Sequence, residues 1–491
     1  VGALIVGLAL HARARRELDA LVAAQTRDAA VAQDEARRTA VQRDVARKHA
    51  FELFDTQRWP EGETAWAEVD AMASREERAY RAVTGYLDSA LLLDPSRPGL
   101  RSWAADVAFE RLVRAERDRR SDLVDELASR LFSYHDRRRA ELRAAAHLEI
   151  AAPSGTSVSI ERQGAPAQTL GPAPLGALTL PPGSLVLVFE APGRVTARLP
   201  VLLVRGETLK VNVDLPTLAS APPGMLYVPA GRFLFGSAVG SDLRHGFFDT
   251  APLHEVSTAA YFIGRYEVTF GEWIEFLDDL PPVERFRRRP SSGSVETALT
   301  LTEIAPRRWR LTLTPTQHTY VADTGQKLHY ERRAKRADQD WTKFPVTAVS
   351  YPDAVAYAAW LARTGRVPGA RVCDEYEWER AARGADARTF PSGETLGPDD
   401  ANIDVTYGRE PVAFGPDEVG SHPASRSPVG ADDMAGNVWE FARSVELADA
   451  SIARGGAWYL SELNARSMNR TPTEPTLRHP FIGVRLCATP R

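Results

Sequence analysis

Seven short motifs follow one another in fixed order along the C-terminal half of this 491-residue chain. No single motif is distinctive, but their order and spacing together constrain the fold strongly. They mark out a C-terminal domain over residues 222–491, which begins at the linker Pro222-Pro-Gly224. The motifs occupy residues 228–237, 266–269, 344–350, 375–384, 433–440, 454–458 and 482–485.

The composition is that of an ordinary soluble protein, and the length suggests two to four domains. Hydrophobic residues make up 44% of the chain, charged residues 26%, and the formal net charge is -4. This weakly acidic balance gives no electrostatic reason to expect nucleic acid as a partner. The only cysteines, Cys373 and Cys487, exclude a disulfide-rich scaffold and an all-cysteine zinc site. They can still form one bridge in an oxidising compartment.

Residues 1–10 are apolar, and the polar sequence starts at His11. This segment is too short for the hydrocarbon core of a membrane, which takes about 20 residues. The simplest interpretation is the second half of a transmembrane helix whose first half lies upstream of Val1; the alternative is a short buried helix. Arg13, Arg15 and Arg16 follow directly, and the positive-inside rule would place such a flank in the cytoplasm.

Residues 11–59 contain neither glycine nor proline, and strong helix formers without breakers predict one long helical stalk. Its apolar positions are sparse, so we expect a loose coiled coil that is a candidate dimer contact. Residues 60–145 predict a compact helical region, in which residues 80–95 resemble the closing helix of a single tetratricopeptide unit. The apolar positions of the stalk are Leu18, Leu21, Val22, Val31, Val41 and Val45.

From residue 146 to residue 216 the chain alternates apolar and polar residues between Pro/Gly turns, which is the period of half-buried strands. The turns at 180–184 and 190–193 resemble those of the PEGA family of small extracytoplasmic β-domains.

Two helices are well signalled in the C-terminal domain. Ser350 and Asp353 form a capping pattern for a helix that ends near Gly365, and a second helix runs from Asp374 to Gly384. Residues 281–340 are a long insertion, in which residues 309–314 alternate like an edge strand. Dense turn residues after 386 indicate irregular loops around a small sheet.

The order and spacing of the seven motifs resemble the formylglycine-generating enzyme (sulfatase-modifying factor) family. The resemblance implies an α+β, C-type-lectin-like fold with much irregular loop. The whole order of stalk, PEGA-like β-domain and C-terminal domain resembles the region that follows the kinase domain in some bacterial receptor-type serine/threonine kinases.

The resemblance also shows which chemistry is missing. In that family a pair of cysteines after the Arg-Gly-Gly motif binds copper(I), which soft thiolates select, and dioxygen oxidises a substrate cysteine. Here Leu460 stands where the first cysteine would fall, Ala457 replaces the usual serine, and the next cysteine is Cys487. We therefore expect no copper. A related branch binds non-haem iron through His-x-x-x-His-x-Glu, a spacing that does not occur in this sequence.

The family also holds calcium in its loops, through backbone carbonyls and Asn or Glu side chains. The alternative for these loops is that Asn437 and Glu440 only tie them together by hydrogen bonds. The positions that match the family's calcium ligands are Asn402, Ile403, Gly436, Val438 and Glu440.

A ligand-binding surface is predicted in the segment from Trp458 to Arg470, flanked by the 281–340 insertion. Aromatic faces and side chains with several donors are typical of recognition surfaces, and the arginines favour an anionic or amide-rich ligand. The alternative is that Arg466 is buried against loop carbonyls; Trp439 and Arg454 are expected to define the fold. The candidate ligand-binding residues are Trp458, Tyr459, Arg466, Asn469 and Arg470.

Cys373 and Cys487 are predicted to form a disulfide, because the segments that carry them are neighbours in the family. Together these features predict a non-catalytic ligand-binding or sensory region of a membrane-anchored bacterial signalling protein. We expect a single span in the inner membrane, with most of this chain periplasmic or extracellular, and an extracytoplasmic protein or a small molecule as the partner. The alternative is a formylglycine-generating-type oxidase that acts on a protein cysteine with a non-standard metal site.

Overall fold

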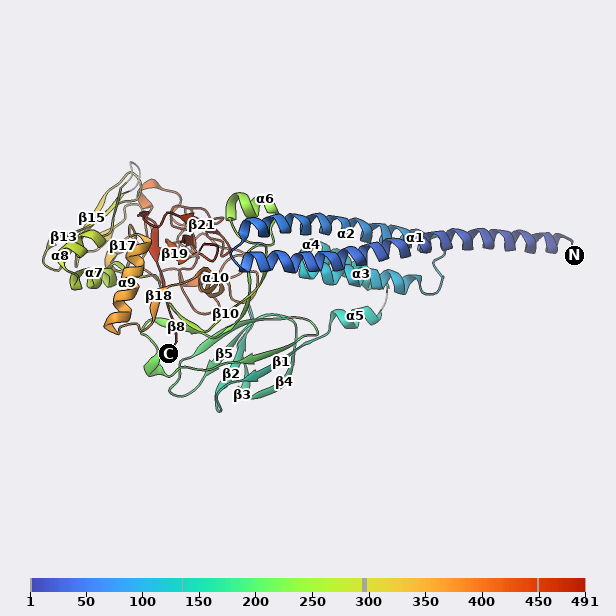
Figure 1. Ribbon diagram of the computed structural model, residues 1–491, viewed down its shortest axis with the longest axis horizontal. Helices are drawn as coiled ribbons and strands as arrows, with labels where there is room; N and C mark the ends of the chain where they lie inside the picture. The colour runs from blue at the N-terminus through green and yellow to red at the C-terminus, as the bar shows by residue number, and fades with distance from the viewer. Residues whose placement is uncertain (1, 135, 294–297, 448–449, 491) are drawn as a thin grey trace. The chain divides into compact units, whose positions relative to one another are not determined.

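The computed structural model describes residues 2–134, 136–293, 298–447 and 450–490. Contacts within the chain separate two compact units, residues 1–144 and 145–491. The first unit is helical, and the second is built mainly from short strands and loops (Figure 1). A helical region followed by a β-rich region is the order that the sequence predicts.

The first unit begins with a long helical hairpin. After Gly7 the first helix meets no glycine or proline, and it continues to Asp55. Gln57, with a φ of 63°, reverses the chain, and Pro60 lies in the first turn of the returning helix. Gly99, in a left-handed conformation, precedes the third helix. The helices of this unit are α1 (Gly2–Asp55), α2 (Trp59–Leu93), α3 (Leu100–Arg117), α4 (Ser121–Tyr134) and α5 (Asp136–Leu142).

Alanines, rather than the larger apolar residues, form the inner face of α1. Ala29, Ala32 and Ala36 are buried against Val83 and Leu87 of α2. Of the predicted seam only Val22 is buried, whereas the side chains of four others point to solvent, with exposed fractions from 56% to 69%. The predicted seam is therefore wrong at these four positions: small side chains let α1 pack closely along α2. The exposed residues are Leu21, Val31, Val41 and Val45.

No helix within the described residues combines the length and the apolar character that a membrane span needs. Residues 1–10 stay a predicted end of such a span, and their described part belongs to α1.

The second unit begins with a β-domain made of two sheets around one core. One sheet has the order β4-β1-β7 and the other β3-β2-β5-β6. Leu148, Ile150, Val158, Leu187 and Phe189 fill the space between them. The PEGA assignment of this domain stays a prediction. Its strands are β1 (Ala146–Ala151), β2 (Ser157–Glu161), β3 (Gln168–Pro172), β4 (Leu175–Leu180), β5 (Gly183–Glu190), β6 (Ala197–Leu203) and β7 (Thr208–Asn212).

The same core continues into the C-terminal domain, since it also contains Tyr227, Phe262 and Ala488. Two four-stranded sheets organise that domain, with the orders β18-β23-β11-β8 and β21-β20-β19-β22. A further pair, β9 and β10, lies beside them. The strands are β8 (Met225–Val228), β9 (Gly231–Phe235), β10 (His254–Thr258), β11 (Tyr261–Gly264), β18 (Ala370–Val372), β19 (Trp439–Arg443), β20 (Ser451–Arg454), β21 (Arg470–Thr473), β22 (Ile482–Val484) and β23 (Leu486–Ala488).

Both helices predicted from their caps are present. The Ser350 hydroxyl accepts from the Asp353 amide and closes a capping box at the start of α9 (Tyr351–Thr364), which ends at the left-handed Gly365. Asp374 and Glu377 do the same for α10 (Glu375–Arg383). Gly384 ends α10 with a φ of 76° but a ψ of -136°, outside the left-handed helical region. The other helical segments are α6 (Ser241–Leu243), α7 (Phe270–Asp279) and α8 (Pro282–Arg288), a π-turn at Arg244–Phe248, and short 3-10 turns at Leu218–Ser220, Trp341–Lys343, Pro411–Ala413 and Pro423–Ser425.

The insertion is a small sheet of its own, with the order β12-β13-β14-β15. The prediction of an edge strand at 309–314 is wrong, because β14 pairs with both β13 and β15. Trp309, Leu311 and Leu313 are fully buried, so the alternating pattern reports one buried face and not an edge. The strands are β12 (Ser291–Gly293), β13 (Ala298–Ala305), β14 (Arg308–Thr314), β15 (Tyr320–Asp323), β16 (Leu328–His329) and β17 (Asp338–Gln339).

Candidate functional site

The Arg-Gly-Gly motif turns the chain out of β20 into the loop predicted to bind ligand. Gly456 has a φ of 78°, and a Cβ added there would lie 2.9 Å from the Ala465 Cα, so only glycine fits. Arg454 is fully buried and forms an ion pair with Glu379. It also donates a hydrogen bond to the Ser467 carbonyl of the loop at 2.8 Å. Arg454 therefore positions the loop and does not face a ligand.

The five predicted ligand-binding residues do not share one surface. Tyr459 has an exposed fraction of 45% and Arg466 is half-buried, whereas Trp458, Asn469 and Arg470 are buried. Their prediction as a common surface is therefore wrong for the last three. The reason is that the loop folds back on itself and on the body of the domain.

Arg470 is a buried arginine whose hydrogen bonds and ion pairs lie inside the protein. Its Nε donates to Glu375 at 3.2 Å, and its Nη1 donates to Glu446 at 3.1 Å and to the Asp249 carbonyl at 2.8 Å. Burial alone would lower the pKa of Arg470, but Glu375 and the other acidic neighbours outweigh it and raise that pKa. Arg470 therefore stabilises the fold through these buried ion pairs and hydrogen bonds. It is not a residue that binds an anionic ligand.

A group of aromatic rings surrounds Tyr459 instead. The Tyr459 and Phe481 rings lie nearly parallel, at an angle of 19° and with centroids 6.4 Å apart. Trp458 stands almost perpendicular to both, at 5.8 Å and 6.0 Å, and Phe414 contacts Tyr459 at 5.3 Å. His479 packs on Phe481 at 3.9 Å. We call these five residues the aromatic cluster.

Two polar atoms of the aromatic cluster are buried and lack a hydrogen-bond partner within the part of the chain that the structure describes. They are Nε1 of Trp458 and Nδ1 of His479. Burial lowers the pKa of His479, which keeps its ring neutral at neutral pH. An unsatisfied buried donor costs about 1–3 kcal/mol, and Trp458 is fully buried, so its N–H is enclosed within the protein. The ring of Tyr459, with an exposed fraction of 45%, is the part of the cluster that an aromatic or apolar group can contact.

The 281–340 insertion fixes the loop that carries Phe414. Arg333 of the insertion lies between the Tyr330 and Tyr407 rings, 3.5 Å and 3.9 Å from their centroids. It donates to the carbonyls of Ala413 and Gly415 at 2.6 Å and 2.9 Å, on either side of Phe414. The insertion thus reaches the aromatic cluster indirectly, through this loop.

Asp417 completes that anchor. Its carboxylate pairs with Arg333 at 2.5 Å and accepts from Tyr407 at 2.7 Å and from Gln339 at 2.6 Å, and His422 Nε2 lies 2.8 Å away. Burial alone would raise the pKa of Asp417, but Arg333 and His422 hold it well below its usual range. Sequence reasoning missed Arg333, Phe414 and Asp417, because they lie in turn-rich stretches without periodicity and meet only in the folded chain.

Of the predicted calcium residues, Asn402 and Ile403 lie against Gly436. The Asn402 carbonyl accepts from the Asn437 amide at 2.8 Å, and a Cβ on Gly436 would lie 2.4 Å from that carbonyl. The Glu440 carboxylate, however, accepts from Trp378 at 2.6 Å and from Arg485 at 2.6 Å and 2.8 Å. Glu440 is therefore already neutralised by a buried arginine.

Two further buried carboxyl groups, those of Glu267 and Asp433, lie close to Glu440 and Arg485. Burial, with the Asp433 charge second, raises the pKa of Glu267 well above its usual value; burial raises the pKa of Asp433 to about 6. One oxygen of Glu267 accepts no hydrogen bond within the described residues and lies 3.6 Å from the Arg485 guanidinium. Glu267, Asp433 and Glu440 thus outnumber Arg485, and the raised pKa values mean that the fold favours the neutral, protonated forms of Glu267 and Asp433.

Side chains alone do not make a metal site here. Within the described residues, no three His, Cys, Asp or Glu side chains are placed so that they could hold a metal. Calcium at Asn402, Ile403, Gly436, Val438 and Glu440 would depend on backbone carbonyls, as the sequence analysis expects, and it stays a prediction.

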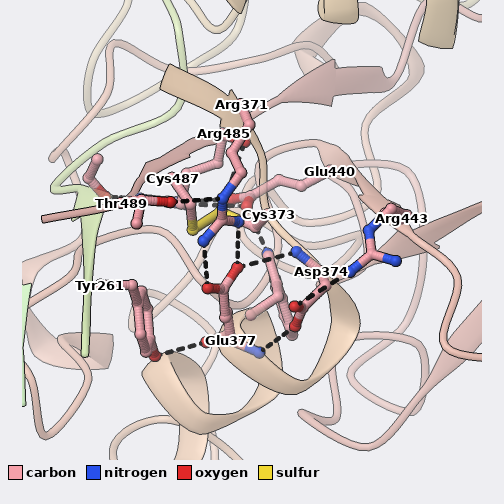
Figure 2. The surroundings of a disulfide bond; sticks show 12 residues. Tyr261, Arg371, Cys373, Asp374, Glu377, Glu440, Arg443, Arg485, Cys487 and Thr489 are labelled. Atoms are coloured by element: carbon pink, nitrogen blue, oxygen red, sulfur yellow. Dashed lines mark hydrogen bonds and ion pairs between the residues drawn. A yellow bond between two sulfur atoms is a disulfide. The ribbon is translucent and has the colours of Figure 1, made fainter. Parts of the chain in front are cut away.

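The two cysteines are bonded to each other, as predicted from the sequence. β18 and β23 are antiparallel neighbours, which brings the Cα atoms of Cys373 and Cys487 to 4.8 Å. Both residues are fully buried. Figure 2 shows the bond beside the Arg371 guanidinium, which donates two hydrogen bonds of 2.5 Å to the Glu377 carboxylate.

Neither cysteine sulfur is a free thiol in this structure, so neither is in the form that binds copper(I). Leu460, at the position of the family's first copper cysteine, is half-buried against the main hydrophobic core. The bonded pair accounts for both cysteines of the sequence.

A family model described as "Sulfatase-modifying factor enzyme 1-like domain" matches residues 213–490. The chain belongs to this family. The resemblance drawn from the seven motifs is confirmed.

Three relatives of this chain have names that describe different functions. "Hercynine oxygenase" of Mycobacterium tuberculosis is 32% identical over 261 residues, 48% of this chain and 54% of that protein. "Inactive C-alpha-formylglycine-generating enzyme 2" of Mus musculus is 26% identical over 253 residues, 48% and 74% of the two chains. "Serine/threonine-protein kinase pkn1" of Chlamydia caviae is 27% identical over 284 residues, 54% and 37%. The chain spans little more than half the length of the first of these.

Proposed function

We propose that this chain is a non-catalytic ligand-binding region of a membrane-anchored bacterial signalling protein, in which a family fold built for cysteine oxidation has become a recognition domain. One observation carries the proposal: both cysteines of the sequence are in the disulfide between Cys373 and Cys487. No thiolate is left for copper(I), which the family's oxidation requires. A relative named as inactive is consistent with such a loss.

The signalling context rests on different support. A relative named as a serine/threonine kinase matches over 54% of this chain. In our proposal the kinase domain of a receptor-type serine/threonine kinase lies upstream, an inner-membrane span ends at residues 1–10, and the rest is periplasmic or extracellular. The buried disulfide favours an oxidising compartment. Alkylation of free thiols in intact cells, followed by mass spectrometry, should find Cys373 and Cys487 bonded; alkylated thiols would contradict this location.

The proposed binding site is the aromatic cluster. The exposed Tyr459 ring, stacked on Phe481, favours a small molecule or protein side chain with an aromatic or apolar group. This replaces the anionic ligand expected from the arginines, because Arg470 is buried and paired. Calcium in the adjoining loops is proposed as a structural ion, held by Asn402, Glu440 and backbone carbonyls.

The deciding experiment is an assay of cysteine-peptide oxidation with and without added copper(I). The full chain should give no turnover, whereas an active formylglycine-generating enzyme of the family serves as the positive control. Turnover by the full chain, with any metal, would establish the alternative of an oxidase with a non-standard metal site.

Binding at the aromatic cluster needs a separate test. In a fluorescence screen of small aromatic compounds against the full chain, hits should lose about 1–2 kcal/mol of binding free energy in Tyr459→Ala and far less in Tyr459→Phe. Leu447→Ala, exposed and outside the cluster, is the matched control. Hits that bind Tyr459→Ala as tightly as the wild type would place the site elsewhere.

A further inference from the structure

A groove of about 410 Å³ opens in the second unit where β6, β7 and β9 approach one another. Its lining includes consecutive residues: 199–202 of β6, 209–212 of β7 and 230–234 around β9. Successive side chains of a strand point to opposite faces, so a sheet face would contribute only every second residue. Consecutive residues mean that the strands present their edges to the groove.

The sheet order agrees with this. β7 is the last strand of the sheet β4-β1-β7, and β6 is the last strand of the sheet β3-β2-β5-β6. The β-domain is therefore open along the corner between β6 and β7. An open edge offers unpaired backbone N–H and C=O groups, which can template a further strand.

The backbone hydrogen bonds between β7 and β1 identify which groups of β7 are free. The Glu207 carbonyl accepts from the His147 amide at 2.8 Å, and the Val213 amide donates to the Ala151 carbonyl at 3.0 Å. Odd-numbered residues of β7 therefore turn their backbone groups toward β1, because the direction alternates along a strand. The backbone groups of Lys210 turn the other way, toward the groove.

The same alternation sends the backbone groups of Thr208 and Asn212 toward the groove. Within the described residues, the amides of Lys210 and Asn212 donate no backbone hydrogen bond. β6 is the poorer edge, since Pro200 has no N–H to give. The free pairing edge is thus that of β7.

The walls of the groove set the side-chain pattern of an occupant. Leu199, Val201 and Phe233 are buried and line the groove together with Val211. Lys210 lies at an exposed position, and its ammonium is 3.1 Å from Glu149. A strand in the groove would place every second side chain against the apolar wall and the others toward solvent.

We propose that this groove binds an extended peptide segment of a partner protein, with alternating apolar side chains, which adds a strand to the free edge of β7. Main-chain hydrogen bonds to Thr208, Lys210 and Asn212 would provide the affinity, and the apolar wall would provide the selection. Four lining residues of β7 correspond to about 13 Å of strand, which is long enough for three or four residues of the peptide.

Hydrogen exchange of the full chain tests the open edge first. The amides of Lys210 and Asn212 should exchange at least about tenfold faster than those of Leu209 and Val211, which face β1. An acetylated and amidated hexapeptide of alternating threonine and valine should then slow the exchange at Lys210 and Asn212 by about tenfold or more. Protection of these two amides in the free protein would overturn the proposal. If that protection grows with protein concentration, the occupant is a second copy.

A pair of variants separates the backbone from the side chain. Lys210→Ala keeps the groove-facing N–H, so its affinity for the labelled hexapeptide in fluorescence anisotropy should stay within about threefold of the wild type. Lys210→Pro removes that N–H without removing a bond to β1, and it should weaken binding by about tenfold or more. Equal binding by the two variants would overturn strand addition, and so would the absence of hexapeptide binding to the wild type. Should Lys210→Pro fail to fold, the exchange measurement on the wild type decides alone.

Discussion

At the scale of single residues, buried charge is the main feature of the C-terminal domain. Arg454, Arg470 and Arg485 are almost completely buried, and each is paired with a glutamate. Such pairs satisfy the polar backbone of a loop-rich fold, which a regular sheet would satisfy by itself. The exception is the region of Glu267 and Asp433, where acidic groups outnumber the arginine.

Asp433 should make the domain lose stability as pH rises. Its folded pKa of about 6 is above the unfolded value of about 3.9, so its contribution is fully present below pH 4 and is lost as pH rises through 6. In EDTA, the unfolding free energy should fall by about 2–3 kcal/mol from this cause between pH 4 and pH 7. Urea unfolding over this range should show that Asp433→Asn removes this part of the fall and leaves the part due to Glu267, whose pKa is also raised, whereas Glu410→Gln, at an exposed site, keeps the whole fall. An unchanged slope in Asp433→Asn would show that another group is responsible.

Calcium should counter the same loss. An ion that binds only the folded state stabilises it by mass action, so chelation at pH 7.5 should lower the melting temperature of the second unit. Glu440→Gln should reduce the response to calcium without removing the alternative ties of the loop to Asn402. Identical melting curves in calcium and in EDTA would mean that protons alone balance these carboxyls.

At the scale of elements, the insertion acts as a clamp on the loop that carries Phe414. Arg333→Ala removes a fully buried cation that pairs with Asp417 and binds two loop carbonyls. The loss should be about 3–5 kcal/mol of unfolding free energy, because it removes the permanent positive charge beside buried Asp417 and leaves only His422, Tyr407 and Gln339 as partners of that carboxylate. Chemical denaturation provides the measurement.

Lys335→Ala is the control for this clamp, since Lys335 is exposed on the same segment and its pair with Asp399 lies at the surface. It should change stability by about 0.5 kcal/mol or less. A similar small effect of Arg333→Ala would show that the insertion is held elsewhere.

α1 should mediate a dimer through the side that does not contact α2. Large apolar residues exposed along one helix are a candidate interface, and we expect light scattering of the full chain to show a dimer. Val31→Ser, Val41→Ser and Val45→Ser combined should shift it toward the monomer with little change in stability, since all three are exposed. Val113→Ser, exposed on α3, should leave the dimer intact. A wild-type monomer at all concentrations would rule this contact out.

The elements differ in how well the sequence predicts them. The starts of α9 and α10 were predictable because a cap depends on residues three positions apart, such as Ser350 and Asp353. The inner face of α1 was not, because alanines such as Ala36 carry little hydrophobic signal and the exposed valines carry more. The family's motifs located the loop after β20, but burial of Arg470 depends on Glu375 and Glu446, which lie far away in sequence.

At the scale of the whole molecule, the chain should unfold in two steps, because its contacts form two compact units. Calorimetry should show two transitions. Cys373→Ala combined with Cys487→Ala should lower only the transition of residues 145–491, because the first unit contains no cysteine. The bond closes a loop with a sequence separation of 114, which in the chain-entropy model contributes about 4–5 kcal/mol. A single transition, or a shift of both, would contradict this division.

The hydrophobic core that the β-domain shares with Tyr227, Phe262 and Ala488 has a consequence for how this protein can change over time. Ala488 belongs to β23, so the β-domain is completed by residues that are synthesised well after its own strands. A recombination event that exchanged either domain alone would leave half of a core without its complement. The two domains are therefore expected to be inherited together, as one module with two folds.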